Sequence, residues 1–98
     1  MIVRKDLNIM SRKILAAGNW KMNKTPSEAA VLMDELIAKC KDAKNDVLVC
    51  PPLTALSTVV EKAKGSNIKV GAQNFYFEDK GAYTGEVSAE MLKDLGVE

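Results

Sequence analysis

Two side chains that can hold an anion follow the first apolar run of the sequence. Asn19 and Lys21 come just after Ile14–Ala17, and because they are two apart their side chains can point to the same side of a strand end. Lysine supplies a compact positive charge for a phosphate, and asparagine supplies a neutral donor that orients a bound group. Taken alone, these residue types favour a simpler interpretation as solvated loop residues, with Trp20 as partly buried packing.

The other chemistry-bearing side chains give weaker signals. Glu78, Asp79 and Glu86 could act as acid or base, but no nucleophile or ligand set accompanies them, so solvation and ion pairing are the favoured roles. Cys40 and Cys50 are ten apart, which matches no metal or redox spacing and favours buried free thiols. Glycine-rich phosphate-binding spacings are absent. The sequence has no histidine, so these residues cannot complete a mechanism that needs imidazole.

The segment 73–87 has no helical or strand period and contains most of the aromatic residues. Phe75, Tyr76, Phe77 and Tyr83 are four of the five aromatic side chains in the sequence. A loop of this length is usually functional or disordered, and the aromatic content argues against disorder. Two interpretations remain open, an aromatic anchor at a protein interface and a loop folded back over its own core. Base stacking is disfavoured because carboxylates are interleaved with the rings.

The composition is that of an ordinary globular chain and argues against two classes of partner. The 98 residues are 47% hydrophobic and 28% charged, with a formal net charge of +1. No basic tract offers a surface for nucleic acid, and no apolar run is long enough to cross a membrane. We therefore expect neither a nucleic-acid partner nor a membrane partner.

The N-terminal residues differ from the rest of the sequence. Residues 1–12 have no clear period and are expected to form a poorly ordered extension, with 13–98 as the folded portion. Charges interrupt the extension, so it lacks the apolar core of a signal peptide, and the expected location is cytoplasmic. Met10 could equally be a second start site.

Strands alternate with helices in the rest of the sequence. The expected order is a strand at Ile14–Ala17, a helix from Pro26 to about Lys41, a strand at Val47–Cys50, a helix around Leu56–Ala63, a strand at Ile68–Ala72 and a helix at Ser88–Leu95. Thr25 and Glu28 have the spacing of a capping box, and Thr54 is a candidate cap for the second helix. This alternation predicts parallel crossovers and an α/β architecture.

Four blocks of sequence together resemble the triosephosphate isomerase family. They are Gly18-Asn19-Trp20-Lys21-Met22-Asn23, Cys50-Pro51-Pro52, Gly71-Ala72-Gln73-Asn74 and Gly81-Ala82-Tyr83-Thr84-Gly85-Glu86-Val87-Ser88-Ala89-Glu90-Met91-Leu92, in the family's order and at its spacings. The resemblance covers residues 13–96, roughly the first three-eighths of a TIM (β/α)8 barrel of ~250 residues. It implies a partial barrel of three parallel βα units.

The resemblance implies an isomerase that interconverts dihydroxyacetone phosphate and glyceraldehyde 3-phosphate in glycolysis and gluconeogenesis, without a metal or organic cofactor. Lys21 would neutralise the substrate phosphate and the developing enediolate, and Asn19 would help to hold the substrate. The complete protein would be a homodimer in which Thr84, at the loop tip, contacts the partner's Asn19 region. The remaining interface residues would be Phe75, Tyr76, Tyr83 and Glu86.

The sequence also departs from the family pattern. The catalytic histidine, the glutamate base and the phosphate loops would follow Gly96, and residues 1–9 have no counterpart in the usual pattern. We therefore expect an inactive N-terminal fragment whose sheet keeps two open edges and which self-associates or is marginally stable. One alternative is a part-barrel assembly module that acts after joining a complementary chain. Another is a freestanding phosphate-binding domain.

Overall fold

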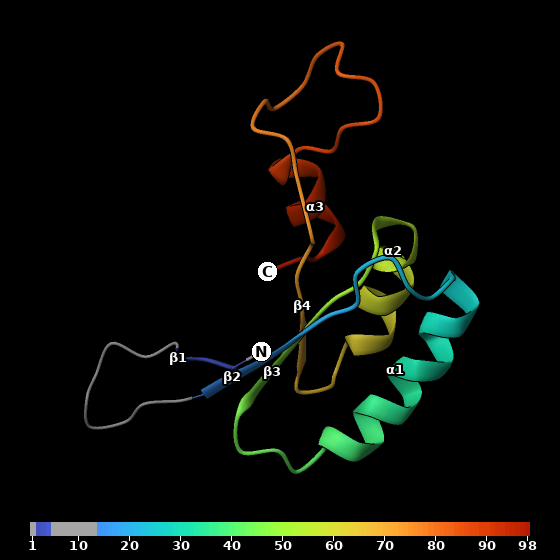
Figure 1. Cartoon of the computed structure of the whole chain (residues 1–98), viewed down its shortest axis with the longest axis vertical. Helices are drawn as coiled ribbons and strands as arrows, with labels where there is room; N and C mark the ends of the chain where they lie inside the picture. Colours follow the sequence, from blue (N-terminus) through green and yellow to red (C-terminus); the bar gives the residue numbers. More distant parts are fainter. Residues whose placement is uncertain (1, 5–13) are drawn as a thin grey trace.

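The computed structural model describes residues 2–4 and 14–98 of the chain (Figure 1). The elements are β1 (Ile2–Arg4), β2 (Ile14–Asn19), α1 (Pro26–Cys40), β3 (Asp46–Cys50), α2 (Leu53–Ala63), β4 (Ile68–Val70) and α3 (Ala89–Leu95). The predicted alternation of strands and helices is confirmed over 14–98. The third predicted strand ends at Val70 rather than Ala72.

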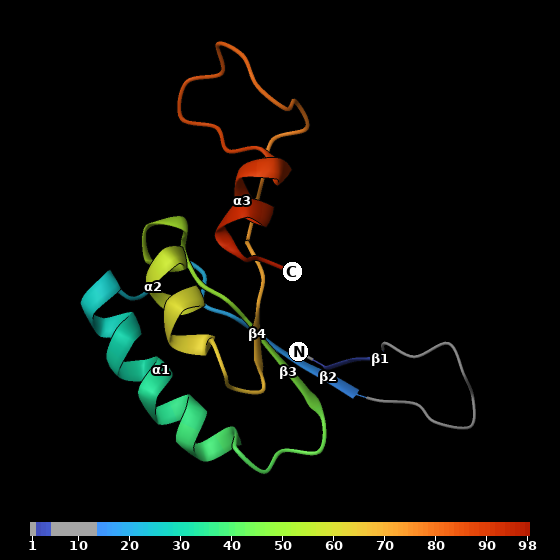
Figure 2. The ribbon, with the colours of Figure 1, turned by 180° about the vertical axis from the view of Figure 1, so that it is seen from behind.

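The strands form a single twisted sheet in the order β1-β2-β3-β4. β2, β3 and β4 run parallel, as predicted, and form a partial barrel of three βα units. α1 and α2 cover the same face of this sheet, and α3 lies beyond the end of β4 (Figures 1 and 2). None of the helices in the described part is long and apolar enough to cross a bilayer.

The described sheet still ends in two edge strands, as expected, but one of them is β1 rather than β2, because β1 covers part of the outer edge of β2. β1 pairs antiparallel with β2 and places Ile2 opposite Ala16 and Arg4 opposite Ile14. Three residues are too few to show a period, so the pairing of β1 with β2 was not predicted. Most of the predicted extension at 1–12 lies outside the described residues.

The helix ends follow local hydrogen-bonding chemistry. The Thr25 hydroxyl accepts the Glu28 N–H (3.2 Å), and the Glu28 carboxylate accepts the Thr25 N–H (2.9 Å), which confirms the capping box at α1. These hydrogen bonds hold the pKa of Glu28 below its ordinary value. The predicted Thr54 cap is wrong because Thr54 lies inside α2, which begins at Leu53 with Pro52 as its N-cap.

The core lies between the sheet and the two covering helices. Its buried residues are Ala29, Met33, Val49, Ala55, Leu56, Val59, Val60, Ala63, Ile68, Val70 and Leu92. Strand side chains alternate between faces, so Leu48 and Cys50 point to the face without helices. A Cβ at Gly71 would lie 3.1 Å from the Cys50 sulfur, so glycine allows close packing on that face. On the face of the sheet without helices, the small residues Cys50 and Gly71 therefore lie at the strand ends next to the candidate site.

Candidate functional site

The candidate site is the turn that follows β2 at the carboxyl edge of the parallel strands. Asn19 is the last residue of β2, and Lys21 has the left-handed backbone φ of 57°. Sites of α/β proteins lie at this edge because the strand ends and their loops converge there. The structure therefore brings the two predicted residues together in one turn.

Side chains from two strand ends hold the Lys21 backbone in its unusual conformation. The Asn19 side-chain oxygen Oδ1 accepts the Lys21 N–H at 2.9 Å. The Gln73 side-chain nitrogen Nε2 donates to the Lys21 carbonyl at 3.0 Å and to the Cys50 carbonyl at 2.8 Å. A left-handed conformation costs a non-glycine residue about 1–2 kcal/mol, so these bonds offset a strain that would otherwise open the turn.

The rest of the turn is also fixed by hydrogen bonds. The Trp20 N–H donates to the Cys50 carbonyl at 3.1 Å, and the Asn23 side chain donates to the Trp20 carbonyl at 2.7 Å. Lys24 has a second left-handed φ, of 79°, and leads directly into the α1 cap. The turn is therefore held at both of its ends.

The Lys21 side chain is available to an anion. The residue is exposed, and none of the described carboxylates pairs with its ammonium group. Asn19 uses its Oδ1 oxygen to hold the Lys21 backbone, and its amide nitrogen Nδ2 makes no hydrogen bond to the described residues. The turn thus offers a positive charge and a neutral donor, which suits an anionic ligand such as a phosphate group.

Gln73 is a positioning residue that the sequence did not reveal. It occurs in the block Gly71–Asn74 that carried the family resemblance, but no role was assigned to it. Its two acceptors lie 52 and 23 residues away in the chain. A glutamine three residues after the end of β4 at Val70 was the available signal, and the parallel order of the strands explains its reach.

Cys50 lies beneath the turn and is a structural thiol. Burial raises its pKa, and the hydrogen bond from the Gly71 backbone only partly opposes this effect. A raised pKa reduces the thiolate fraction, so the sulfur is a poor nucleophile. Cys50 contributes to the site through its backbone carbonyl, which accepts from Trp20 and Gln73.

The predicted interface residues lie together on the long loop between β4 and α3. Tyr76 packs on Phe77 and on Tyr83, with ring centroids 4.7 Å and 4.8 Å apart. Phe75 and Phe77 are 57% and 77% exposed. The outer part of the loop projects beyond α3 and away from the sheet, α1 and α2 (Figures 1 and 2), whereas Val87 at its base packs against the core. Thr84 and Glu86 are exposed on the same loop.

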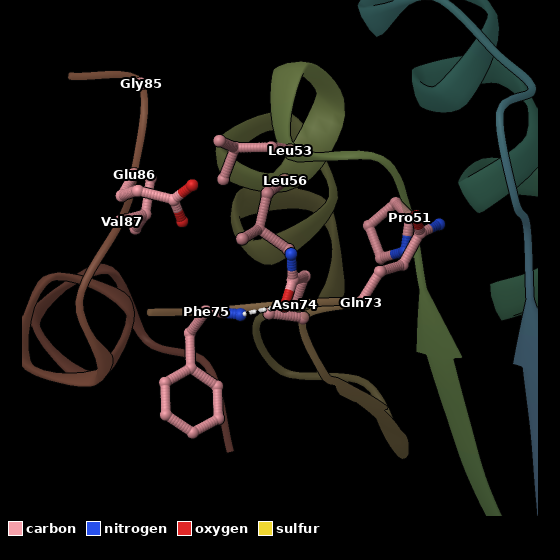
Figure 3. A pocket seen from close by; sticks show the side chains of 10 residues that line it. Pro51, Leu53, Leu56, Gln73, Asn74, Phe75, Gly85, Glu86 and Val87 are labelled. Carbon is pink, nitrogen blue, oxygen red and sulfur yellow. Dashed lines mark hydrogen bonds between the residues drawn. The ribbon is translucent and has the colours of Figure 1, made fainter. Parts of the chain in front are cut away.

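A small cavity of about 180 Å³ lies between the base of this loop and the start of α2. Figure 3 shows Phe75 and Glu86 from the loop beside Leu53 and Leu56 of α2. Gln73 lines the cavity as well, whereas neither Asn19 nor Lys21 does. The cavity therefore adjoins the turn but is separate from the Lys21 charge.

Comparisons with known proteins agree on one family. The triosephosphate isomerase family model matches residues 14–98. A triosephosphate isomerase of Clostridium botulinum is 60% identical over 86 residues, which cover 88% of this chain and 35% of that relative. One from Acetivibrio thermocellus is 58% identical over 89 residues, covering 91% of this chain and 36% of the relative.

A solved structure gives the same result for the fold. The triosephosphate isomerase of Bartonella henselae superposes with a TM-score of 0.77 at 41% sequence identity. The match covers 85% of this chain and 34% of that structure. The chain therefore spans about a third of the length of the proteins that it resembles.

Proposed function

The chain belongs to the triosephosphate isomerase family, and from this premise we propose that it supplies the substrate-holding strand end of a triosephosphate isomerase. The substrate would be a phosphorylated triose, and the reaction would interconvert dihydroxyacetone phosphate and D-glyceraldehyde 3-phosphate, a step of glycolysis and gluconeogenesis. The observation that carries the proposal is the exposed Lys21 ammonium group on a turn fixed by Asn19 and Gln73.

The proposed reaction moves a proton next to a carbonyl, so negative charge develops on the substrate oxygen. Lys21 stabilises that charge because the turn fixes the lysine backbone before the substrate binds. The reaction also needs a base and a neutral imidazole, for which triosephosphate isomerase is itself the standard example. The 98 residues contain no histidine, so the groups that move the proton come from other residues.

Activity measurements test this proposal. The chain alone should give an isomerisation rate equal to that of buffer, and the same residues joined in one polypeptide to the other barrel strands should give turnover. Lys21→Met should then lower the rate by roughly 10²–10³-fold, as removal of a charge-stabilising group does. Lys24→Met is the matched control, because Lys24 shares the turn and the left-handed backbone. Equal rates for both variants would contradict the role of Lys21.

A homodimer of the complete protein forms part of the proposal. The exposed rings of Phe75 and Phe77, with Thr84 at the same loop, support a surface that a second subunit covers. Association should be measured by sedimentation on the reconstituted protein. A monomer at micromolar concentration would contradict this part of the proposal.

One observation favours the second candidate, an assembly module that joins a complementary chain. The Glu98 N–H donates to the Val70 carbonyl at 2.9 Å, on the side of β4 that faces away from β3. This outer edge of β4 is therefore able to accept backbone N–H groups, as pairing with a further strand requires. If the chain is such a module, turnover depends on mixing in a fixed molar ratio. Tight binding of a phosphorylated triose by the chain alone would instead favour a freestanding phosphate-binding domain.

A further inference from the structure

β1 adds an antiparallel strand to a sheet whose other strands are parallel. Ile2, Val3 and Arg4 lie opposite Ala16, Leu15 and Ile14 in the register of the pairing. The family model begins at residue 14, so β1 lies outside the segment shared with the family. The contact with β2 is therefore a feature of this chain that the common fold does not account for.

The edge that β1 occupies is the edge at which a barrel closes. Every strand of a closed barrel has two neighbours, and β3 already takes one side of β2. The last strand of an eightfold barrel therefore pairs with the opposite side of β2, in the parallel direction. One backbone edge accepts only one partner along the same residues, so β1 and a closing strand compete for it.

β1 covers only half of this edge. Its partners are Ile14, Leu15 and Ala16, whereas Ala17–Asn19 have no strand on that side within the described part of the chain. The uncovered half lies next to the Lys21 turn. A closing strand can begin to pair there and then replace β1, because a ladder of three residue pairs is short.

We propose that β1 is an edge guard, which blocks pairing of the β2 edge with other strands until the closing strand of a barrel displaces it. The partner that displaces it is an extended segment that pairs parallel to β2, and it enters from the free half at Ala17–Asn19. An exposed sheet edge otherwise pairs with strands of other chains, which gives the guard a physical function.

Hydrogen exchange resolved to single residues tests the guard directly. In a variant that starts at Met10, the amides of Ile14–Ala16 that face β1 should exchange roughly tenfold faster, as expected for the loss of about one net hydrogen bond. The amides that face β3 should keep their protection. Equal protection of both sets with and without residues 1–9 would overturn the proposal.

Two proline variants provide a matched control in the full chain. Neighbouring N–H groups of a strand point to opposite sides, so only one of Val3→Pro and Arg4→Pro removes a donor from the ladder. One variant should reproduce the loss of protection, and the other should resemble the unmodified chain. Equal behaviour of the two variants would mean that strand pairing is not the cause.

The competition is tested by capture of a polypeptide that carries the other barrel strands, measured by the rate at which a one-to-one complex forms. The variant that starts at Met10 should capture it roughly tenfold faster than the full chain, in line with the exchange result. Equal rates, or no capture by either chain, would overturn the assignment of this edge as the closing edge. Neither readout uses isomerase activity, so failure here is distinguishable from failure of the proposed function.

Discussion

The turn at 19–25, with Gln73 bonded to it, and the loop at 75–87 are both at the carboxyl end of the sheet, yet they are held in different ways. The turn is fixed by bonds between distant segments, since Gln73 joins the carbonyls of Lys21 and Cys50. The loop is held by its own residues, with Tyr76 packed on Tyr83 and joined to Val87 at its base. The comparison separates a turn that long-range hydrogen bonds hold from a loop that is held locally and leaves the rings of Phe75 and Phe77 exposed, where the proposed second subunit would cover them.

The largest effect should come from Gln73→Glu, which replaces a donor by a carboxylate against the carbonyls of Lys21 and Cys50. Loss of two hydrogen bonds costs about 2 kcal/mol, and repulsion between the oxygen atoms adds to this. The Lys21 and Trp20 amides should therefore exchange at least roughly thirtyfold faster. Hydrogen exchange followed by mass spectrometry measures this change.

The control for that variant is the neighbouring Asn74→Asp. The Asn74 side-chain oxygen accepts the N–H of Phe75, and an aspartate keeps this acceptor while it introduces the same charge. Exchange at Lys21 should therefore stay as in the unmodified chain. If Asn74→Asp opens the turn as much as Gln73→Glu does, the added charge rather than the lost donor is responsible.

The next effect should come from Gly81→Ala, which tests the local character of the loop. Gly81 has a φ of 145°, and a Cβ there would lie 2.6 Å from the Tyr83 ring. We expect a local cost of about 1–3 kcal/mol, with faster exchange of the Tyr76 and Glu86 amides. Exchange at the Lys21 amide should not change, because the loop and the turn are held separately.

Gly85→Ala is the matched control for the loop. Gly85 has a φ of 86°, but a Cβ there meets no atom within 4 Å. Only the backbone strain remains, so its effect should be the smaller of the two. A change at the Lys21 amide in either variant would show that the turn depends on the loop.

A smaller effect on the chain itself is expected from Phe77→Ser, because this ring is 77% exposed. Exposed substitutions change stability by about 0.5 kcal/mol or less, so exchange of the single chain should barely change. Dimerisation of the reconstituted protein should weaken roughly tenfold or more if the ring is an interface anchor. Sedimentation at several concentrations separates the two expectations.

Local patterns predicted the start of α1 and the place of Asn19 and Lys21 at a strand end, whereas the bonds of Gln73 and the pairing of β1 depend on contacts between distant segments. The capping box joins Thr25 to Glu28, which are only three residues apart, so the residue types at these two positions are enough to predict it. The bonds of Gln73 depend on how the parallel strands align, which residue types do not specify. β1 was missed for the same reason, because three residues have no period and only their pairing with β2 makes them a strand.

The smallest effect concerns the far end of the turn, where Glu28 closes the α1 cap. The hydrogen bonds with Thr25 lower the pKa of Glu28 below its ordinary value of 4.5. The ionised carboxylate therefore stabilises the fold at a pH above 4.5, and this contribution is lost as the pH falls through the lowered pKa. Protection of the Glu28 and Ala29 amides, corrected for the intrinsic pH dependence of exchange, should decrease over that range. Glu28→Gln keeps the capping geometry without a titrating group, so its protection should stay level. A parallel decrease in both chains would assign the acid sensitivity to another group.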